Sequence, residues 1–182
     1  MTTFDDYKLR RIFKSVGTSR NVVNELITLM FLAELVDPGP EVWIVSPWIS
    51  DVPLLDNRAG SFNAVNPGWG RREIRLSDVA VQLMLGGNRL IIVTRPDEHN
   101  KIFLHRLEDA VAETDLTTAL EVIVRDKLHT KGILTRRGLL LGSMNLTYNG
   151  LELNDEVVEY DIDPANLADA RLAFGGYRDG KK

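Results

Sequence analysis

Short apolar runs that alternate with longer helical patterns are the feature that most constrains the fold of this chain. Val42–Val45 reads V-W-I-V and Leu90–Val93 reads L-I-I-V. Runs of this length are typical of strands that are buried on both faces of a sheet. Helical patterns that end at Gly or Pro lie between the runs. This alternation predicts an α/β fold, namely an α/β/α sandwich with a central mixed, mostly parallel sheet.

The periodicity also gives residue ranges for the expected elements. Ser19 and Ser77 are the expected N-caps of the first two helices. Residues 47–70 show little periodicity, so we expect a long loop that leaves the carboxyl end of a strand, where α/β folds place their ligands. Trp48 in this loop is a candidate substrate contact, and the alternative is that it only packs beneath the loop. The expected strands are 10–14, 41–46, 89–94, 120–125 and 156–162, and the expected helices are 20–36, 78–85, 98–113 and 164–174.

One predicted hairpin carries a concentration of reactive side chains. His129 and Lys131 lie two residues apart in a short apolar run, and in an extended strand they would point to the same face. A turn at Gly138 and a second apolar run, Leu139–Leu141, complete the hairpin. The second run ends in Gly142-Ser143-Met144-Asn145, which supplies a hydroxyl, a carboxamide and backbone N–H groups.

These groups suit phosphate chemistry. Lys131 offers a point charge to phosphate oxygens, while Ser143, Asn145 and the turn amides offer neutral donors. Neutral imidazole is present near pH 7, so His129 could attack phosphorus. A carboxylate such as Glu156 could keep one ring nitrogen protonated and leave the other free to attack. We expect no metal and no cofactor, because Lys131 and the donors already neutralise the charge that develops.

At these residues the chain resembles the phospholipase D superfamily, whose signature is H-x-K, usually an Asp, then G-S-x-N and a downstream Glu. The match is His129-Thr130-Lys131, Gly142-Ser143-Met144-Asn145 and Glu156, whereas Arg136 occupies the position of the family Asp and the spacing to G-S-x-N is about one residue short. The alternative is an unrelated hairpin with one stray His. The resemblance implies a phospholipase D-like fold. The candidate catalytic residues are His129, Lys131, Asn145 and Glu156, and the candidate substrate-binding residues are Gly142, Ser143, Trp48 and Arg136.

The number of motif copies bears on the oligomeric state. The superfamily reaction uses two histidines, one that attacks phosphorus to form a phosphohistidine and one that protonates the leaving oxygen. The second H-x-K of this chain, His99-Asn100-Lys101, lies in a predicted helix, where residues two apart diverge, and no G-S-x-N follows it. Single-copy members of the superfamily dimerise about a twofold axis. The resemblance therefore implies a homodimer with one composite active site.

The resemblance also suggests a function. Short single-copy members resemble nucleases more than lipid hydrolases, and residues 43–58 are similar to phospholipase D-like proteins of bacterial phage-defence and DNA-modification islands. The implied function is a metal-independent DNA nuclease that works through a phosphohistidine, with other proteins of such a system as expected partners. The alternative is a catalytically inactive nucleic-acid-binding or scaffold subunit, because Arg136 replaces the Asp. Phospholipid hydrolysis is less favoured, since no amphipathic membrane-binding helix is evident.

The composition narrows the class of protein further. The 182 residues suit one domain over 1–182, with frayed ends at 1–9 and 175–182. Cys is absent, so no disulfide framework or thiolate metal site can form. The first residues lack the apolar core of a signal peptide, and no apolar run approaches the roughly 18 residues of a membrane span. We therefore expect a cytoplasmic protein that does not bind membranes.

The charge pattern does not by itself predict a nucleic-acid-binding protein. The net charge is -4 at pH 7, which argues against a dedicated nucleic-acid binder. Local clusters matter more than the total, because charges act over short distances in salt. The basic residues that flank the motif are Arg125, Lys127, Lys131, Arg136 and Arg137.

Overall fold

A seven-stranded sheet forms the centre of the molecule, with the strand order β1-β9-β8-β7-β2-β5-β6. The computed structural model describes residues 8–15 and 17–180. A separate two-stranded sheet pairs β3 with β4. The strands of the central sheet are β1 (Leu9–Lys14), β2 (Glu41–Val45), β5 (Arg89–Thr94), β6 (Leu120–Val124), β7 (Gly132–Leu134), β8 (Leu139–Gly142) and β9 (Glu156–Asp161).

The sheet is mixed, as expected, but most neighbouring strands are antiparallel. Within the described residues, the pairs β2–β5 and β5–β6 are parallel, and the other four pairs are antiparallel. The parallel pairs arise from crossovers that contain α2 (Leu76–Leu85) and α3 (Glu98–Glu113). β7 and β9 run opposite to the other strands and lie between them. Most strands of the described sheet therefore run in one direction, as expected. Most neighbouring pairs are nevertheless antiparallel, which differs from the expectation of a mostly parallel sheet.

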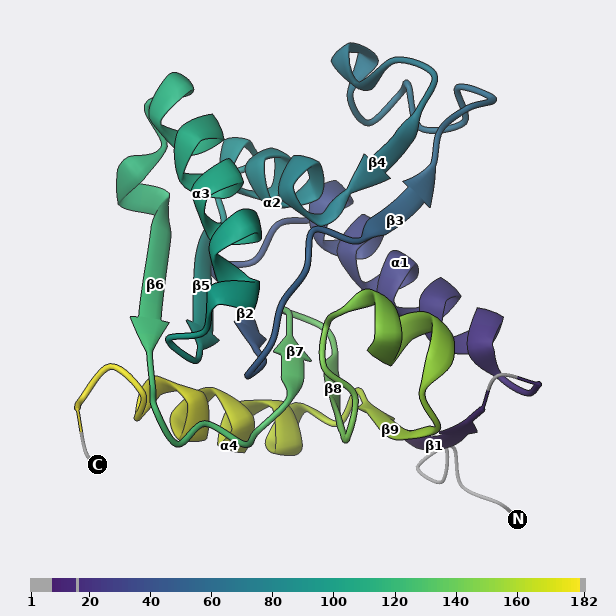
Figure 1. The fold of residues 1–182 in the computed structure, drawn as a ribbon, viewed down its shortest axis with the longest axis vertical. Coiled ribbons are helices and arrows are strands. Elements are labelled where there is room, and N and C mark those ends of the chain that lie inside the picture. The colour runs from purple at the N-terminus through teal and green to yellow at the C-terminus, as the bar shows by residue number, and fades with distance from the viewer. Residues whose placement is uncertain (1–7, 16, 181–182) are drawn as a thin grey trace.

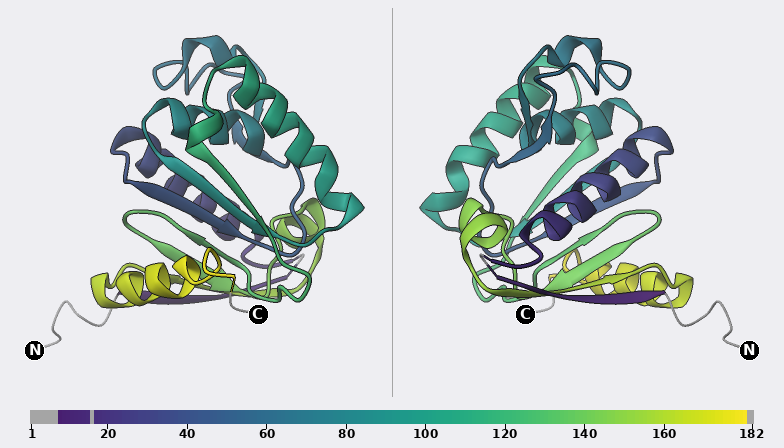
Figure 2. Two further views of the ribbon diagram at one scale, coloured as in Figure 1. Left: turned by 90° about the vertical axis from the view of Figure 1, so that its left-hand side faces the viewer. Right: turned by 90° about the vertical axis from the view of Figure 1, so that its right-hand side faces the viewer.

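Helices cover both faces of the sheet, which confirms the expected α/β/α layers (Figures 1 and 2). On one face, α1 (Arg20–Val36), α2 and α3 pack on a core that contains Val42 and Ile44. On the other face, α4 (Pro164–Gly175) packs on a core that contains Trp43 and Val45. Successive residues of a strand point to opposite faces, so a strand covered on both sides must be apolar throughout.

The expectation of a long loop at residues 47–70 is wrong in part. β3 (Pro53–Asp56) pairs antiparallel with β4 (Glu73–Arg75), and a 3-10 helix, η2, spans Pro67–Trp69. The buried side chain of Asn57 orders the connection, because its amide donates to the Gly70 carbonyl at 2.6 Å and its oxygen accepts from the Phe62 N–H at 2.7 Å. Strands of three or four residues are too short to show periodicity in the sequence.

Of the two expected helix caps, Ser19 occupies the N-cap position of its helix and Ser77 does not. The helix predicted from residue 20 is α1, but the Ser19 side chain makes no cap hydrogen bond. Helix α2 begins at Leu76, and the carboxylate of Asp78 accepts from the backbone N–H of Arg75 at 2.8 Å. Ser77 is therefore not the N-cap, because Asp78 reaches back to the residue before the helix, as in a capping box.

The expectation of frayed ends is wrong at both margins of the described chain. Leu9 already pairs with Asp161 in the sheet. After α4, Tyr177 packs against the core on that face of the sheet, and Arg178 forms ion pairs with Glu41 at 2.8 Å and Glu121 at 2.9 Å. Residues 1–7 and 181–182 of the expected frayed ends lie outside the described residues. No helix in the described part of the chain is long and apolar enough to cross a membrane.

Candidate active site

The segments that carry the motif lie together at one end of the strands, called here the motif edge of the sheet (Figure 1). β2, β5, β6 and β8 end at this edge, and β7 and β9 begin there, because β7 and β9 run in the opposite direction. His129 and Lys131 lie in the connection from β6 to β7, Gly142 is the last residue of β8, and Ser143–Asn145 follow it. Glu156 is the first residue of β9. Carboxyl ends of strands are the usual ligand-binding edge of α/β sheets.

The G-S-x-N turn is fixed against β9 by close backbone contacts. A Cβ at Gly142 would lie closer than 3.0 Å to the Val157 carbonyl oxygen, so this position requires glycine. The Ser143 N–H donates to the Val157 carbonyl at 3.0 Å, and the Val157 N–H donates to the Ser143 hydroxyl oxygen at 3.0 Å. The Ser143 hydroxyl also donates to the buried carboxylate of Glu156. Ser143 and Glu156 therefore hold the turn in place.

We expect Gly142→Ala to destabilise the fold by about 1–3 kcal/mol, because the added Cβ must push β8 away from the backbone of β9. Urea unfolding followed by circular dichroism measures the change. Gly175→Ala is the matched control, because a Cβ at Gly175 meets nothing within 4 Å. Equal stabilities of the two variants would contradict the close packing at Gly142.

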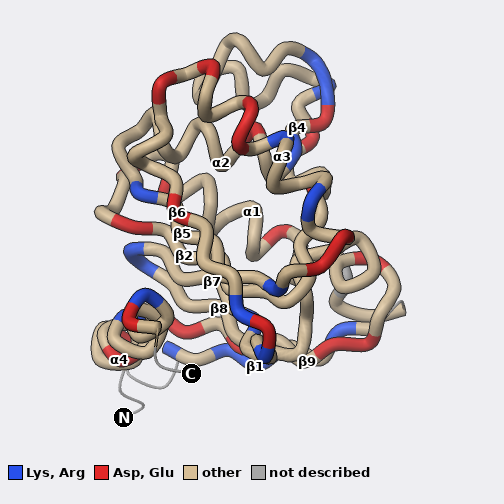
Figure 3. Tube along the Cα trace, turned by 60° about the vertical axis from the view of Figure 1, so that its left-hand side comes forward, with Lys and Arg blue, Asp and Glu red and all other residues tan. Residues whose placement is uncertain are grey.

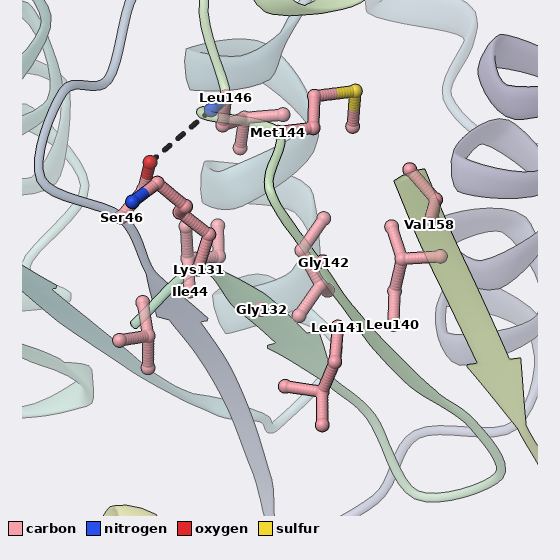
Figure 4. A pocket seen from close by; sticks show the side chains of 12 residues that line it. Ile44, Ser46, Lys131, Gly132, Leu140, Leu141, Gly142, Met144, Leu146 and Val158 are labelled. Carbon is pink, nitrogen blue, oxygen red and sulfur yellow. Dashed lines mark hydrogen bonds between the residues drawn. The ribbon is translucent and has the colours of Figure 1, made fainter. Parts of the chain in front are cut away.

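His129 and Lys131 lie in an irregular segment and not on a strand, since β7 begins only at Gly132. The Lys131 ammonium donates to the backbone carbonyl of His129 at 2.6 Å, which differs from the expected side-by-side projection of two strand residues. The His129 ring is exposed. Lys131 lines a small pocket with Ser46 and Gly142, so its side chain lies at the motif turn (Figure 4).

Asn145 is held by the end of β2. The Ser46 hydroxyl accepts from the Leu146 N–H at 3.1 Å, the bond drawn in Figure 4, and donates to the Trp48 carbonyl at 2.8 Å. Oδ1 of Asn145 lies 3.4 Å from the same hydroxyl oxygen. The π-helix η4 (Asn149–Leu153) packs on the same turn, where a Cβ at Gly150 would lie closer than 3.0 Å to the Asn145 carbonyl oxygen. Ser46 is thus a positioning residue that the sequence did not single out.

Arg95 is a second residue at the site that the sequence did not single out. Its Nε donates to the Leu128 carbonyl at 2.8 Å, and its Nη2 lies 3.2 Å and 3.4 Å from the two ring nitrogens of His129. The guanidinium also lies over the Trp48 ring, 5.1 Å from its centroid. Its position directly after a buried strand was the feature of the sequence that could have marked Arg95 as a candidate site residue.

Trp48, a candidate substrate contact, lies beneath the Arg95 guanidinium. Its indole N–H donates to Oδ2 of Asp97 at 2.9 Å. The backbone N–H of His99 and this indole N–H hold the pKa of Asp97 below its ordinary value. Asp97 therefore stays ionised and fixes the ring on which the Arg95 guanidinium rests.

The expected substrate-binding role of Arg136 does not fit its position. Arg136 lies in the turn between β7 and β8, at the end of these strands opposite to the motif edge. Its guanidinium pairs with Asp37 at 2.9 Å. The reason is geometric, because β7 carries the chain away from His129 by about 3.3 Å per residue. Within the described chain Glu156 also makes no hydrogen bond to His129, since its carboxylate is bound to Ser143 and Asn154.

The site gathers basic side chains that form no salt bridge with a described carboxylate, although the charge of Arg95 helps to lower the pKa of the nearby Asp97 carboxylate. Arg95 and Lys131 contact His129, and Arg125 and Lys127 precede it in the segment that continues from β6. Figure 3 shows that basic and acidic residues are otherwise distributed over the whole backbone. Arg72, by contrast, is paired with Asp78 at 2.7 Å. Unpaired cations create a local positive potential even in an acidic protein.

Comparison with known proteins shows the fold. No family model matches the chain, and no curated protein matches it. Among solved structures, NucT from Helicobacter pylori is 11% identical with a TM-score of 0.57, and the match covers 94% of this chain and 96% of NucT. Nuc from Salmonella typhimurium, a phospholipase D family member, is 12% identical with a TM-score of 0.54, over 94% of this chain and 91% of Nuc.

A third similar structure is that of TrmBL2, described as an archaeal chromatin protein with a novel mode of DNA binding. It is 14% identical to this chain with a TM-score of 0.54. The match covers 97% of this chain but only 54% of TrmBL2. These likenesses, with the sheet order and layers described above, show that the chain has the phospholipase D-like fold expected from its sequence.

Proposed function

We propose that the protein is a metal-independent phosphodiesterase that cleaves DNA through a phosphohistidine on His129. The observation that carries the proposal is an exposed His129 whose imidazole lies beside the Arg95 guanidinium and whose backbone carbonyl accepts from the Lys131 ammonium. Neither cation forms a salt bridge with a carboxylate of the described residues. Two cations beside a nucleophile fit a phosphodiester, whose reaction develops negative charge on phosphorus oxygens. The structural likeness to Nuc, a phospholipase D family member, and to NucT supports the same reaction class.

The proposed reaction has two balanced steps. A ring nitrogen of His129 attacks phosphorus, a P–N bond forms, and the P–O bond to the leaving nucleoside breaks as that oxygen takes a proton from a second imidazole. Water then attacks phosphorus, gives a proton to the second imidazole, and releases the phosphate as the P–N bond breaks. Lys131 and Asn145 would bind the non-bridging oxygens in both steps.

We further propose that the second imidazole is His129 of another copy of the chain. The other histidines lie elsewhere: His99 is on α3, with Nε2 2.8 Å from the Ser50 hydroxyl, and His105 is exposed on the same helix. Neither makes a hydrogen bond with His129 in the described part of the chain. A homodimer with a twofold axis at the site would bring two His129 rings to one phosphate.

The decisive experiment incubates purified protein with single- and double-stranded DNA in excess EDTA. We expect cleavage by the wild type, none by His129→Ala, and an acid-labile, base-stable phosphoryl adduct on His129 when the reaction is quenched early. His105→Ala is the matched control, because His105 is an exposed histidine outside the motif. Cleavage of neither DNA form, or equal activity of His129→Ala, would contradict the proposal.

Arg95→Lys should lower kcat/KM for DNA by about 10- to 100-fold. A lysine ammonium cannot bond the Leu128 carbonyl, stack on Trp48 and reach the imidazole at once. Steady-state cleavage of a labelled oligonucleotide measures the change. Arg89→Lys is the control, since Arg89 starts the same strand and is exposed. An unchanged rate for Arg95→Lys would remove Arg95 from the site.

A second candidate function is an inactive DNA-binding subunit with the same fold. It is favoured by the Glu156 carboxylate, which binds Ser143 and not the imidazole that it would orient. The likeness to a DNA-binding chromatin protein also fits it. The two candidates differ in one measurement, because an inactive subunit would bind DNA without forming any phosphoryl adduct.

We also propose a setting in the cytoplasm, within a bacterial defence or DNA-modification system that includes other proteins. The support is the similarity of residues 43–58 to phospholipase D-like proteins of such islands. These residues form β2, the Trp48 segment that supports Arg95, and β3. Loss of phage protection in cells that express His129→Ala in place of the wild type would test this setting.

A further inference from the structure

Another pocket is lined in part by His129 and by none of the G-S-x-N residues. Residues 124–130 and Tyr177 line it, and its volume is about 580 Å³. The segment leaves the outer strand β6 and runs toward β7, so the pocket extends from His129 toward the margin of the sheet. A molecule that is bound at His129 and is longer than one phosphodiester would enter this pocket.

The lining of the pocket includes two cationic side chains, Arg125 and Lys127, and one carboxylate, Asp126. Neither Arg125 nor Lys127 forms an ion pair with another described residue, although Asp126 lies between them in sequence. The Arg125 guanidinium donates to the Tyr177 carbonyl, and its Nε is buried without a hydrogen-bond partner. Lys127 is exposed and free to reorient. One fixed and one adaptable cation suit an anion that arrives from solvent.

The pocket also offers an aromatic and apolar wall. The Tyr177 ring is held by Phe174, whose ring centroid is 6.2 Å away at 40°, and Arg125 lies 5.9 Å from its centroid. Tyr177 is half-buried, and its hydroxyl bonds to none of the described residues. Val124 is 52% exposed beside it. Fixed aromatic rings beside free cations are the common platform for unpaired bases.

We propose that this pocket is a subsite for the nucleotide next to the scissile phosphate of a single-stranded nucleic acid. Lys127 and Arg125 hold the neighbouring phosphate, while Tyr177 and Val124 contact its base. The base must be unpaired and unstacked to lie against Tyr177, so the subsite favours single strands over duplexes. This inference rests on the proposed function, because it places the reacting phosphate at His129.

The test compares two substrates of the same bond type. Bis(4-nitrophenyl) phosphate is a phosphodiester without neighbouring nucleotides, and a short single-stranded oligonucleotide has them. We expect Lys127→Ala and Tyr177→Leu each to lower the ratio of oligonucleotide kcat/KM to small-diester kcat/KM by about tenfold. Tyr177→Leu keeps an apolar side chain against Phe174, which protects the fold. An unchanged ratio, or a larger effect on duplex than on single strands, would overturn the subsite.

A control and a binding measurement separate this inference from the proposed catalysis. Lys101→Ala removes an exposed lysine that pairs with Glu98 at 2.6 Å on α3, and it should leave the ratio unchanged. If the wild type cleaves neither substrate, the catalytic proposal fails and fluorescence anisotropy decides the subsite. Lys127→Ala and Tyr177→Leu should then weaken single-strand binding by about tenfold. Affinities equal to that of the wild type would overturn it.

Discussion

Dimers that pair one intact subunit with one His129→Ala subunit should be as inactive as the His129→Ala homodimer, with a loss of at least about 10³-fold. The proposed composite site uses one His129 as nucleophile and the other as proton donor. A mixed dimer retains both copies of Lys131 and Asn145 but only one imidazole. The first step of the reaction then fails, because attack on phosphorus by one imidazole and protonation of the leaving oxygen by the other occur together.

Co-expression of the two subunits with different affinity tags allows the mixed dimer to be purified by two successive columns. Cleavage of single-stranded DNA in EDTA then measures its activity. In a bulk experiment with about a tenfold excess of the variant, activity per wild-type subunit should fall about tenfold, because nearly every wild-type subunit then pairs with a variant. Half activity in the mixed dimer would show that each chain has its own complete site.

The oligomeric state gives an independent check of the same idea. Light scattering during gel filtration should give the mass of two 20.5 kDa chains. A monomer with full activity would contradict the composite site. His99→Ala would then be the next variant to test, because its ring bonds Ser50, a residue close in sequence to Trp48 of the site.

The sequence predicted the layers and the location of the motif because both depend on strong local signals. Runs such as V-W-I-V in β2 are fully apolar only if both faces are covered, and the cores on the two faces contain alternate residues of that run. The turn after β8 was also predicted, because the apolar run Leu139–Leu141 ends in Gly142-Ser143-Met144-Asn145. These are properties of single segments and their immediate neighbours.

The parts that the sequence missed depend on contacts between distant segments. Arg95 and Ser46 are single polar residues at strand ends, and nothing in their own segments marks them as neighbours of His129 or Asn145. The partner of Glu156 was also missed, because the Ser143 hydroxyl reaches it only across the β8–β9 pair. Arg136 was placed at the site by its spacing from Lys131, whereas the turn direction of the hairpin carries it away.

One buried carboxylate, that of Glu34 in α1, joins three segments behind the site. It is 2% exposed. Its Oε1 accepts from the Gly39 N–H at 2.5 Å and from the Asn88 amide at 2.8 Å, and its Oε2 accepts from the Arg136 N–H at 3.0 Å. Gly39 precedes β2, Asn88 precedes β5, and Arg136 lies in the β7–β8 turn. The Glu34 side chain therefore fixes one end of these strands, and the candidate site lies at their other end.

Glu34→Ala should therefore destabilise the protein by about 3–5 kcal/mol, because it leaves three buried or half-buried N–H donors without an acceptor and opens a cavity. Urea unfolding monitored by tryptophan fluorescence measures the loss. Glu25→Ala removes an exposed carboxylate from the same helix and should change stability by less than about 0.5 kcal/mol. Glu34→Gln should lie between the two, since it keeps the volume but turns an amide N–H toward one of the donors. A Glu34→Ala protein as stable as Glu25→Ala would show that water satisfies these donors and that the strand ends are held by other contacts.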